Sequence, residues 1–168
     1  MSGSMVILWK GIKPTKLRSS KVRLELLNAV GRQATAIKKD YARTVKSWAK
    51  KPEFEVQQSL KGGPTVIVGT DNLIYKFVDE GTRPHIIAPK GPWPLRFQTG
   101  YKAKTSPGVL DSGSGGKFGP ERRALVVHHP GTEARGFSAK IAAEHEKLFK
   151  RAMERAMVRA ARASGHGG

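Results

Sequence analysis

The stretch KVRLELLNAVGRQATAIKKDYARTVKSWAK, residues 21–50, decides the fold of this 168-residue chain. Its apolar side chains recur at steps of three and four residues, a spacing that places them along one face of an α-helix. They are Leu24, Leu27, Val30, Ala34, Ile37, Tyr41, Val45 and Trp48. We therefore predict a helix over residues 20–51. Ser19 and Ser20 are its candidate N-caps, and Pro52 ends it because the residue before a proline avoids helical backbone angles.

The opposite face of this predicted helix is basic. Its cations are Arg32, Lys38, Lys39, Arg43, Lys46 and Lys50. The whole chain has a net charge of +18, and residues 1–51 contribute +11, from 13 Lys and Arg against two acidic residues. A surface of this charge attracts polyanions such as nucleic acid or an acidic protein face. We therefore interpret the six cations as residues that face either DNA or an acidic partner.

A second helix is predicted over residues 138–163, followed by a tail at 164–168. Its apolar stripe consists of Ile141, His145, Leu148, Ala152, Ala156 and Met157. Ser138 is its candidate N-cap. At the other end of the chain, residues 1–18 form an N-terminal arm that contains the apolar run Met5–Trp9. Basic residues follow this run instead of preceding it, so it predicts an edge strand and not a signal peptide.

Short strands are predicted between the two helices. Residues 53–60 and 64–70 have strand patterns, and the KGGP sequence at 61–64 predicts a hairpin turn between them. Residues 72–81 suit a short helical or irregular segment that ends at Gly81. Residues 93–100 and 123–129 are further strands. The order of helix, strands and helix indicates one α+β domain, in which both helices flank a small, mostly antiparallel sheet within residues 52–137.

Residues 100–119 form a loop rich in glycine and serine. A segment of this composition buries too little apolar surface to offset the entropy of ordering. We therefore predict a flexible insertion that orders, if at all, against another subunit.

The sequence offers no set of residues suited to catalysis or metal binding. There is no cysteine, and neighbouring His128 and His129 point to opposite faces of a strand, so they cannot share one ion. Asp79 and Glu80 could act as acid and base, but adjacent carboxylates diverge, and surface charges beside a turn explain them better. We predict no enzyme activity, no cofactor and no metal, and no stretch is long enough for a membrane span.

Two blocks carry a resemblance to a known family: FVDEGTRPHIIAPKG at 77–91 and VVHHPGTEARGF at 126–137. They resemble the neck and minor tail proteins of long-tailed bacteriophages, which are head–tail joining and tail-completion components. Members typically show a "VEYGT…PH.I.PK" segment and a later "V.HPGT…PF" segment. The matching positions are Val78, Glu80, Gly81, Thr82, Pro84, His85, Ile86, Pro89, Lys90, His129, Pro130, Gly131, Thr132 and Phe137. Gly136 stands where the family usually has proline.

The resemblance implies a structural protein of the virion neck, assembled in the bacterial cytoplasm. Copies of it would form a six- or twelvefold ring beside other neck, portal-side or tail-tube proteins, with genomic DNA passing through without sequence readout. The implied subunit or partner interface consists of Glu80, Gly81, Thr82, Pro84, His85, Ile86, Ile87, His129, Pro130, Gly131, Thr132 and Phe137. A head-proximal adaptor and a tail-proximal terminator fit the sequence equally well.

Two other functions remain open from the sequence. The first is a free nucleic-acid-binding protein without sequence specificity, which the charge alone would support. The second is a small enzyme such as a nuclease, in which His85 or His129 would be required for activity.

Overall fold

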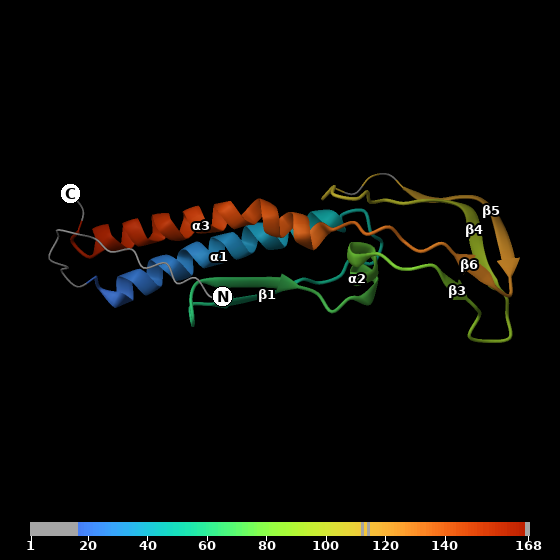
Figure 1. Ribbon diagram of the computed structural model, residues 1–168, viewed down its shortest axis with the longest axis horizontal. Helices are drawn as coiled ribbons and strands as arrows, with labels where there is room; N and C mark the ends of the chain where they lie inside the picture. The colour runs from blue at the N-terminus through green and yellow to red at the C-terminus, as the bar shows by residue number, and fades with distance from the viewer. Residues whose placement is uncertain (1–16, 112, 114, 167–168) are drawn as a thin grey trace.

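The two long helices lie side by side and antiparallel at one end of an elongated molecule (Figure 1). The computed structural model describes residues 17–111, 113 and 115–166. Helix α1 spans Ser19–Thr44 and helix α3 spans Phe137–Ala163. Three contacts run along their length: Arg18 N–H to Ser164 Oγ, Arg159 Nε to Glu25 Oε2, and His145 Nε2 to Asp40 Oδ2. The predicted α+β class is confirmed, while the strand predicted at Met5–Trp9 lies outside the described residues.

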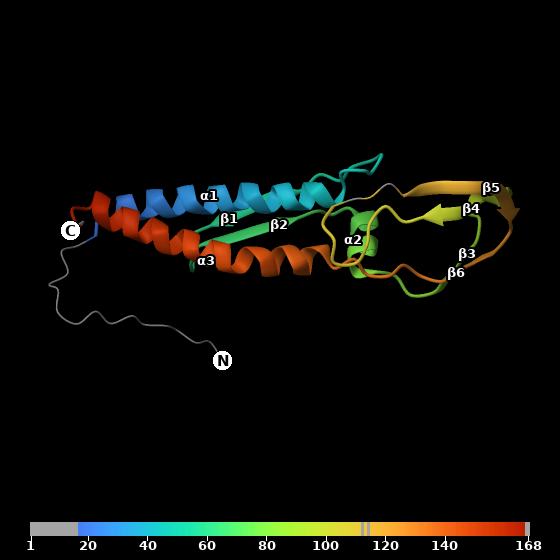
Figure 2. The ribbon, with the colours of Figure 1, turned by 90° about the horizontal axis from the view of Figure 1, so that it is seen from above.

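A β-hairpin lies along the two helices on one side (Figure 2), and its strand β2 lines a pocket together with residues of both helices. Strand β1 (Glu55–Ser59) pairs antiparallel with β2 (Thr65–Gly69), as the KGGP turn predicts. Val66 and Val68 of β2 are half-buried, whereas Ile67 between them is exposed. Because successive side chains of a strand point to opposite faces, one face of the hairpin packs toward the helices and the other is exposed.

The core is an aromatic cluster centred on Tyr75 of helix α2 (Leu73–Glu80). The Tyr75 ring centroid lies 5.1 Å from that of Phe54, 6.1 Å from Phe137 and 6.2 Å from Tyr41. Asn72 begins α2 by accepting a hydrogen bond from Tyr75 N–H through Oδ1 at 3.0 Å. Burial raises the pKa of the Tyr75 phenol, so it stays neutral. Helix α2 thus connects α1, Phe54 just before β1, and the start of α3.

The remaining strands form a β arm at the other end of the molecule (Figure 1). We define this β arm as residues 83–102 and 116–131. Strand β3 (His85–Ile87) pairs with β6 (Val127–His129), and β4 (Leu95–Lys102) pairs with β5 (Gly116–Ala124), both antiparallel. The single predicted sheet is therefore wrong in detail, because the described strands form three separate two-stranded sheets.

Two strand boundaries also differ from the prediction. The strand predicted at 93–100 begins at Leu95 and continues to Lys102, with a bulge between Gln98 and Gly100. The single strand predicted at 123–129 is interrupted, because Leu125 and Val126 lie between β5 and β6 and belong to neither. Because of the interruption, β5 pairs with β4 while β6, which follows it, pairs with β3.

The predicted flexible insertion at 100–119 is largely ordered against its own chain. Its two ends belong to β4 and β5, and the connection between them returns to the helical body. There Leu110 is buried in the Tyr75 cluster, and Gly108 N–H donates to the Arg135 carbonyl at 2.9 Å. Composition alone missed this anchor, because one buried leucine and a few hydrogen bonds hardly change the composition of a glycine-rich stretch.

The first predicted helix is too long at its C-terminal end. Helix α1 ends at Thr44, and turns follow, so Lys46, Trp48 and Lys50 lie beyond it. Arg18 occupies the N-cap position and makes no side-chain cap, so Ser19 and Ser20 are not the caps. The predicted stripe is buried at Val30, Ala34, Tyr41 and Val45 and partly buried at Ile37, whereas Leu24 and Leu27 are exposed.

The C-terminal helix matches its predicted range within one residue. Ser138 is not its cap, because Gly136 takes the N-cap position in a left-handed conformation with φ of 64°. The buried face consists of Phe137, Ile141, His145, Ala156 and Ala160. Leu148 and Met157, which were predicted to belong to it, are exposed.

A partly buried polar contact joins the helix pair. His145 Nε2 lies 2.8 Å from Asp40 Oδ2, and Arg43 lies 3.1 Å from the other carboxylate oxygen. Burial by itself would raise the pKa of Asp40, but hydrogen bonds from His145 and Arg43 outweigh it and hold that pKa below its ordinary value. The ionised carboxylate is therefore favoured in the folded chain.

We expect Leu110→Ala to lower the free energy of unfolding by about 2–4 kcal/mol, because it removes a buried side chain and leaves a cavity. The matched control is Val109→Ala, since Val109 is the exposed neighbour of Leu110. Urea unfolding measures both variants. Equal, small effects at the two positions would mean that the loop is not anchored in the core.

We expect Asp40→Asn to cost about 1–3 kcal/mol at neutral pH, because it weakens two charge-assisted hydrogen bonds. Since the folded pKa of Asp40 is lowered, its contribution is complete above the unfolded pKa of about 4 and is lost as pH falls through the folded value. The difference between wild type and variant should therefore shrink below about pH 4. Urea midpoints measured across this range test the sign, with the exposed Glu144→Gln as control; a constant difference would contradict it.

Candidate assembly interface

The two motif blocks meet where the β arm joins the helical body. Thr82 and Thr132 form an isolated antiparallel bridge although they are 50 residues apart. Thr82 N–H donates to the Thr132 carbonyl at 2.9 Å, and Thr132 N–H donates to the Thr82 carbonyl at 3.1 Å and to its Oγ1 at 2.9 Å. Sequence reasoning placed both blocks in one interface but did not predict that they pair with each other.

Glycine is required in both of the segments that meet at this bridge, which we call the crossing. Gly81 has φ of 77° and Gly131 has φ of 93°, a region that side chains rarely adopt. A Cβ on Gly81 would lie 2.7 Å from the Thr132 carbonyl oxygen, and one on Gly131 would lie 2.3 Å from the Thr82 carbonyl oxygen. The segment predicted to end at Gly81 thus ends in a bend that other residues rarely adopt.

Asp79 links the first block to the start of α3. Its carboxylate accepts hydrogen bonds from Ser138 N–H at 3.2 Å and from Ser138 Oγ at 2.5 Å. Its carbonyl accepts from Arg135 N–H at 3.1 Å and Gly136 N–H at 3.0 Å. The interpretation of Asp79 as a surface charge is therefore wrong, because it caps the helix; Glu80 is exposed, as expected.

The histidines of the two blocks stack at the base of the β arm. The rings of His85 and His129 lie 5.0 Å apart at their centroids and are inclined by 31°. His85 Nδ1 donates to the Arg83 carbonyl at 2.8 Å, and His129 Nδ1 accepts from Gly131 N–H at 3.1 Å. Both rings are thus held by local backbone contacts.

The predicted interface residues fall into two groups. Those with exposed side chains are Glu80, Pro84, His85, Ile86, Ile87 and Pro130. Those partly or fully buried are Gly81, Thr82, His129, Gly131, Thr132 and Phe137. Phe137 has no exposed surface, so its side chain stabilises this chain's own core and does not reach another subunit.

Strand β3 differs from the expected arrangement of its isoleucines. In an extended segment between Pro84 and Pro89, alternation would place one isoleucine inward and one outward, but Ile86 and Ile87 are both exposed. Within the described residues, β3 has one partner strand, β6, and both isoleucines remain exposed beside it.

Large apolar side chains are exposed over the rest of the β arm. They are Trp93, Phe97, Tyr101, Phe118, Leu125 and Val126. Trp93 is 80% exposed and Tyr101 is 67% exposed. A two-stranded ribbon is marginally stable in water by itself, and an apolar surface of this extent is typical of an interaction site. The prediction of a strand over residues 93–100 gave no sign that Trp93 and Phe97 would be exposed.

The β arm is also positively charged. It holds seven Lys and Arg against one acidic residue, Glu121. Arg96 and Arg123 are directly opposite on β4 and β5, and Arg96 pairs with Glu121 at 2.9 Å. The surface therefore combines aromatic side chains with an excess of cations.

The cations predicted to face DNA or an acidic partner are all exposed. Arg32, Lys39 and Arg43 share one face of α1, because they are separated by seven and four residues. Lys46 and Lys50 lie beyond the helix, so the predicted single basic face is wrong for them. Arg43 bonds Asp111 at 2.8 Å, and this contact lowers the pKa of Asp111 against a smaller opposing effect of desolvation.

The described part of the chain shows no group of three His, Asp or Glu residues placed to hold a metal ion. None of the helices within residues 17–111, 113 and 115–166 is long and apolar enough to cross a membrane. Comparison of the chain with models of known families, with curated proteins and with solved structures found no match.

We expect Gly131→Ala to separate the β arm from the helical body. The new methyl group would meet the Thr82 carbonyl oxygen, and the positive φ disfavours alanine, so we expect a loss of about 2–4 kcal/mol. Gly91→Ala is the matched control, because nothing lies within 4 Å of a Cβ at Gly91. Urea unfolding measures the loss, and faster amide exchange at Thr82 and Thr132 locates it. Similar stability of the two variants would rule out a tight crossing.

Proposed function

We propose that this chain is a structural protein of a bacteriophage neck. In this role it is a head–tail connector or tail-completion component that forms a ring through which DNA passes. The observation that carries the proposal is the crossing of the two motif blocks at Thr82 and Thr132, from which an uncovered apolar β arm extends. The shared motif residues thus have a physical task, which is to hold a contact surface at a fixed angle to the body.

The form of the molecule supports assembly rather than chemistry. The aromatic side chains of Trp93, Phe97, Tyr101 and Phe118 are exposed on the β arm. The β arm and the helical body lie at opposite ends of the molecule (Figure 1). A contact between the β arm of one subunit and a different surface of the next would be heterologous, and such contacts close into rings when the rotation permits. A specific interface requires about 800 Å² per partner, and each large aromatic side chain buries roughly 150–250 Å². Trp93, Phe97, Tyr101 and Phe118 supply much of that area.

The charge supports passage of DNA or contact with acidic neighbours. A ring that presents Arg32, Lys38 and Lys39 toward a duplex would neutralise phosphates without reading bases. Exposed cations that contact phosphates act independently of sequence, as the neck function requires.

The test is the oligomeric state of the purified chain and of a β-arm variant. We expect the wild type to form a discrete oligomer by light scattering, and Trp93→Ser with Tyr101→Ser to raise the dissociation constant at least about tenfold, since each loses roughly 1.5–3 kcal/mol of apolar contact. Leu148→Ser with Val158→Ser is the matched control, because these side chains are exposed on α3.

A complementary observation is made on particles. Phage assembled without this chain should accumulate separate heads and tails, and micrographs of intact particles should show it in the neck. A chain that is monomeric at all concentrations and missing from mature particles would contradict the proposal.

Binding of nucleic acid by the free subunit is the second candidate function, favoured by the net charge of +18. It requires tight binding of duplex DNA by the isolated chain, with log affinity falling steeply against log salt concentration. No binding at low salt would eliminate it.

A further inference from the structure

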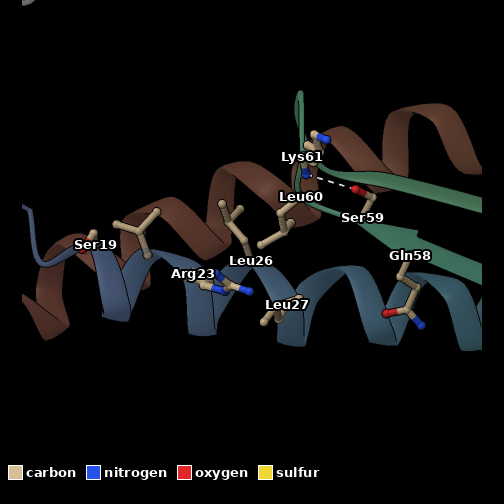
Figure 3. Close-up of a pocket in the computed structure, with 9 residues that line it drawn as sticks. Ser19, Arg23, Leu26, Leu27, Gln58, Ser59, Leu60 and Lys61 are labelled. Atoms are coloured by element: carbon tan, nitrogen blue, oxygen red, sulfur yellow. Dashed lines mark hydrogen bonds between the residues drawn. The ribbon is translucent and has the colours of Figure 1, made fainter.

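An open groove of about 760 Å³ lies between α1 and the end of the β1–β2 hairpin (Figure 3). Its apolar lining comes from Val22, Leu26, Leu27 and Leu60. Leu26 of α1 and Leu60 of the hairpin turn point toward one another. The groove lies at the end of the helical body opposite the β arm (Figure 1).

The groove exists because the hairpin is shorter than α1. A Cβ on Gly31 would lie 3.8 Å from Gln58 Oε1, so β1 reaches α1 at that turn. Val30, next to it, is completely buried. Leu27 and Leu24, one and two turns earlier, are 41% and 51% exposed. The apolar face of α1 thus extends beyond the part of the helix that the hairpin covers.

We propose that residues Met5–Trp9 of the same chain occupy this groove. They are the longest uninterrupted apolar run in the sequence. Residues 1–9 contain no charged side chain, whereas the groove also bears Arg23 and Lys61. A neutral apolar segment can therefore enter without repulsion, unlike most of this strongly cationic chain.

The length of the connection fits this occupant. Seven residues, 10–16, separate Trp9 from Leu17, which is the first described residue. An extended chain of seven residues spans about 23 Å. The part of α1 that lines the groove, from Ser19 to Leu27, extends over only about 12 Å. The run can reach the groove from its own chain, and the short tether gives it a local concentration of the order of millimolar.

The absence of cysteine allows a clean test by disulfide formation. The test variant combines Leu8→Cys with Leu27→Cys, and the control combines Leu8→Cys with Asn28→Cys, since Asn28 is exposed and does not line the groove. In dilute full-length protein we expect an intrachain disulfide to form at least about tenfold faster in the test variant. Non-reducing gels and peptide mass spectrometry measure it. Equal rates in the two variants would overturn the proposal, and so would a disulfide that joins two chains, which would assign the groove to a second copy.

A second measurement needs no added cysteine. Ile7→Ser and Leu27→Ser should each lower the urea midpoint, and the double variant should lose less than the sum of the two, because both substitutions remove the same contact. Strict additivity would show that the two residues do not interact. The docking is independent of whether the chain forms a ring, so failure here leaves the proposed function standing.

Discussion

The backbone crossing at Thr82 and Thr132 is the constraint on which the arrangement of the molecule depends. Two segments 50 residues apart exchange hydrogen bonds there, and the close approach leaves no room for a side chain at Gly81 or Gly131. On one side of the crossing, Tyr75 gathers the aromatic core, and on the other the chain enters β3. The crossing therefore sets the direction in which the β arm leaves the body.

A second attachment makes the β arm more than a loose hairpin. The connection between β4 and β5 returns to the body, where Leu110 enters the core and Lys104 Nζ donates to the Ser47 carbonyl at 3.0 Å. Two attachments restrict rotation about the crossing more than one would. If the β arm is a contact surface, as proposed, holding it rigid would reduce the entropy lost on binding.

Local patterns predicted the elements well and their long-range contacts poorly. The periodicity of α1 and α3, the KGGP turn and the bend at Gly81 follow from short-range rules, and the structure agrees with them. The anchor at Leu110 and the bridge from Thr82 to Thr132 join residues far apart in sequence, and no periodicity marks them. Likewise, the sequence around Asp79 indicates only a carboxylate beside a turn, and its hydrogen bond with Ser138 is known only from the structure. The exposure of the β arm was missed because a strand pattern cannot show whether a second layer covers it.

The β arm combines two surface properties with opposite consequences for binding a second copy. Its cations repel one another, but exposed charge pairs contribute only about 0.2–1 kcal/mol each and are screened within about 10 Å at moderate salt. Burying one large apolar side chain contributes about 1.5–3 kcal/mol. In the proposed ring, contacts made by Trp93 and Tyr101 would therefore outweigh repulsion from Arg122 and Arg123. In the proposed ring, the apolar side chains would be the source of affinity between subunits. The cations, which gain nothing from a like-charged neighbour, would be left to face a polyanion.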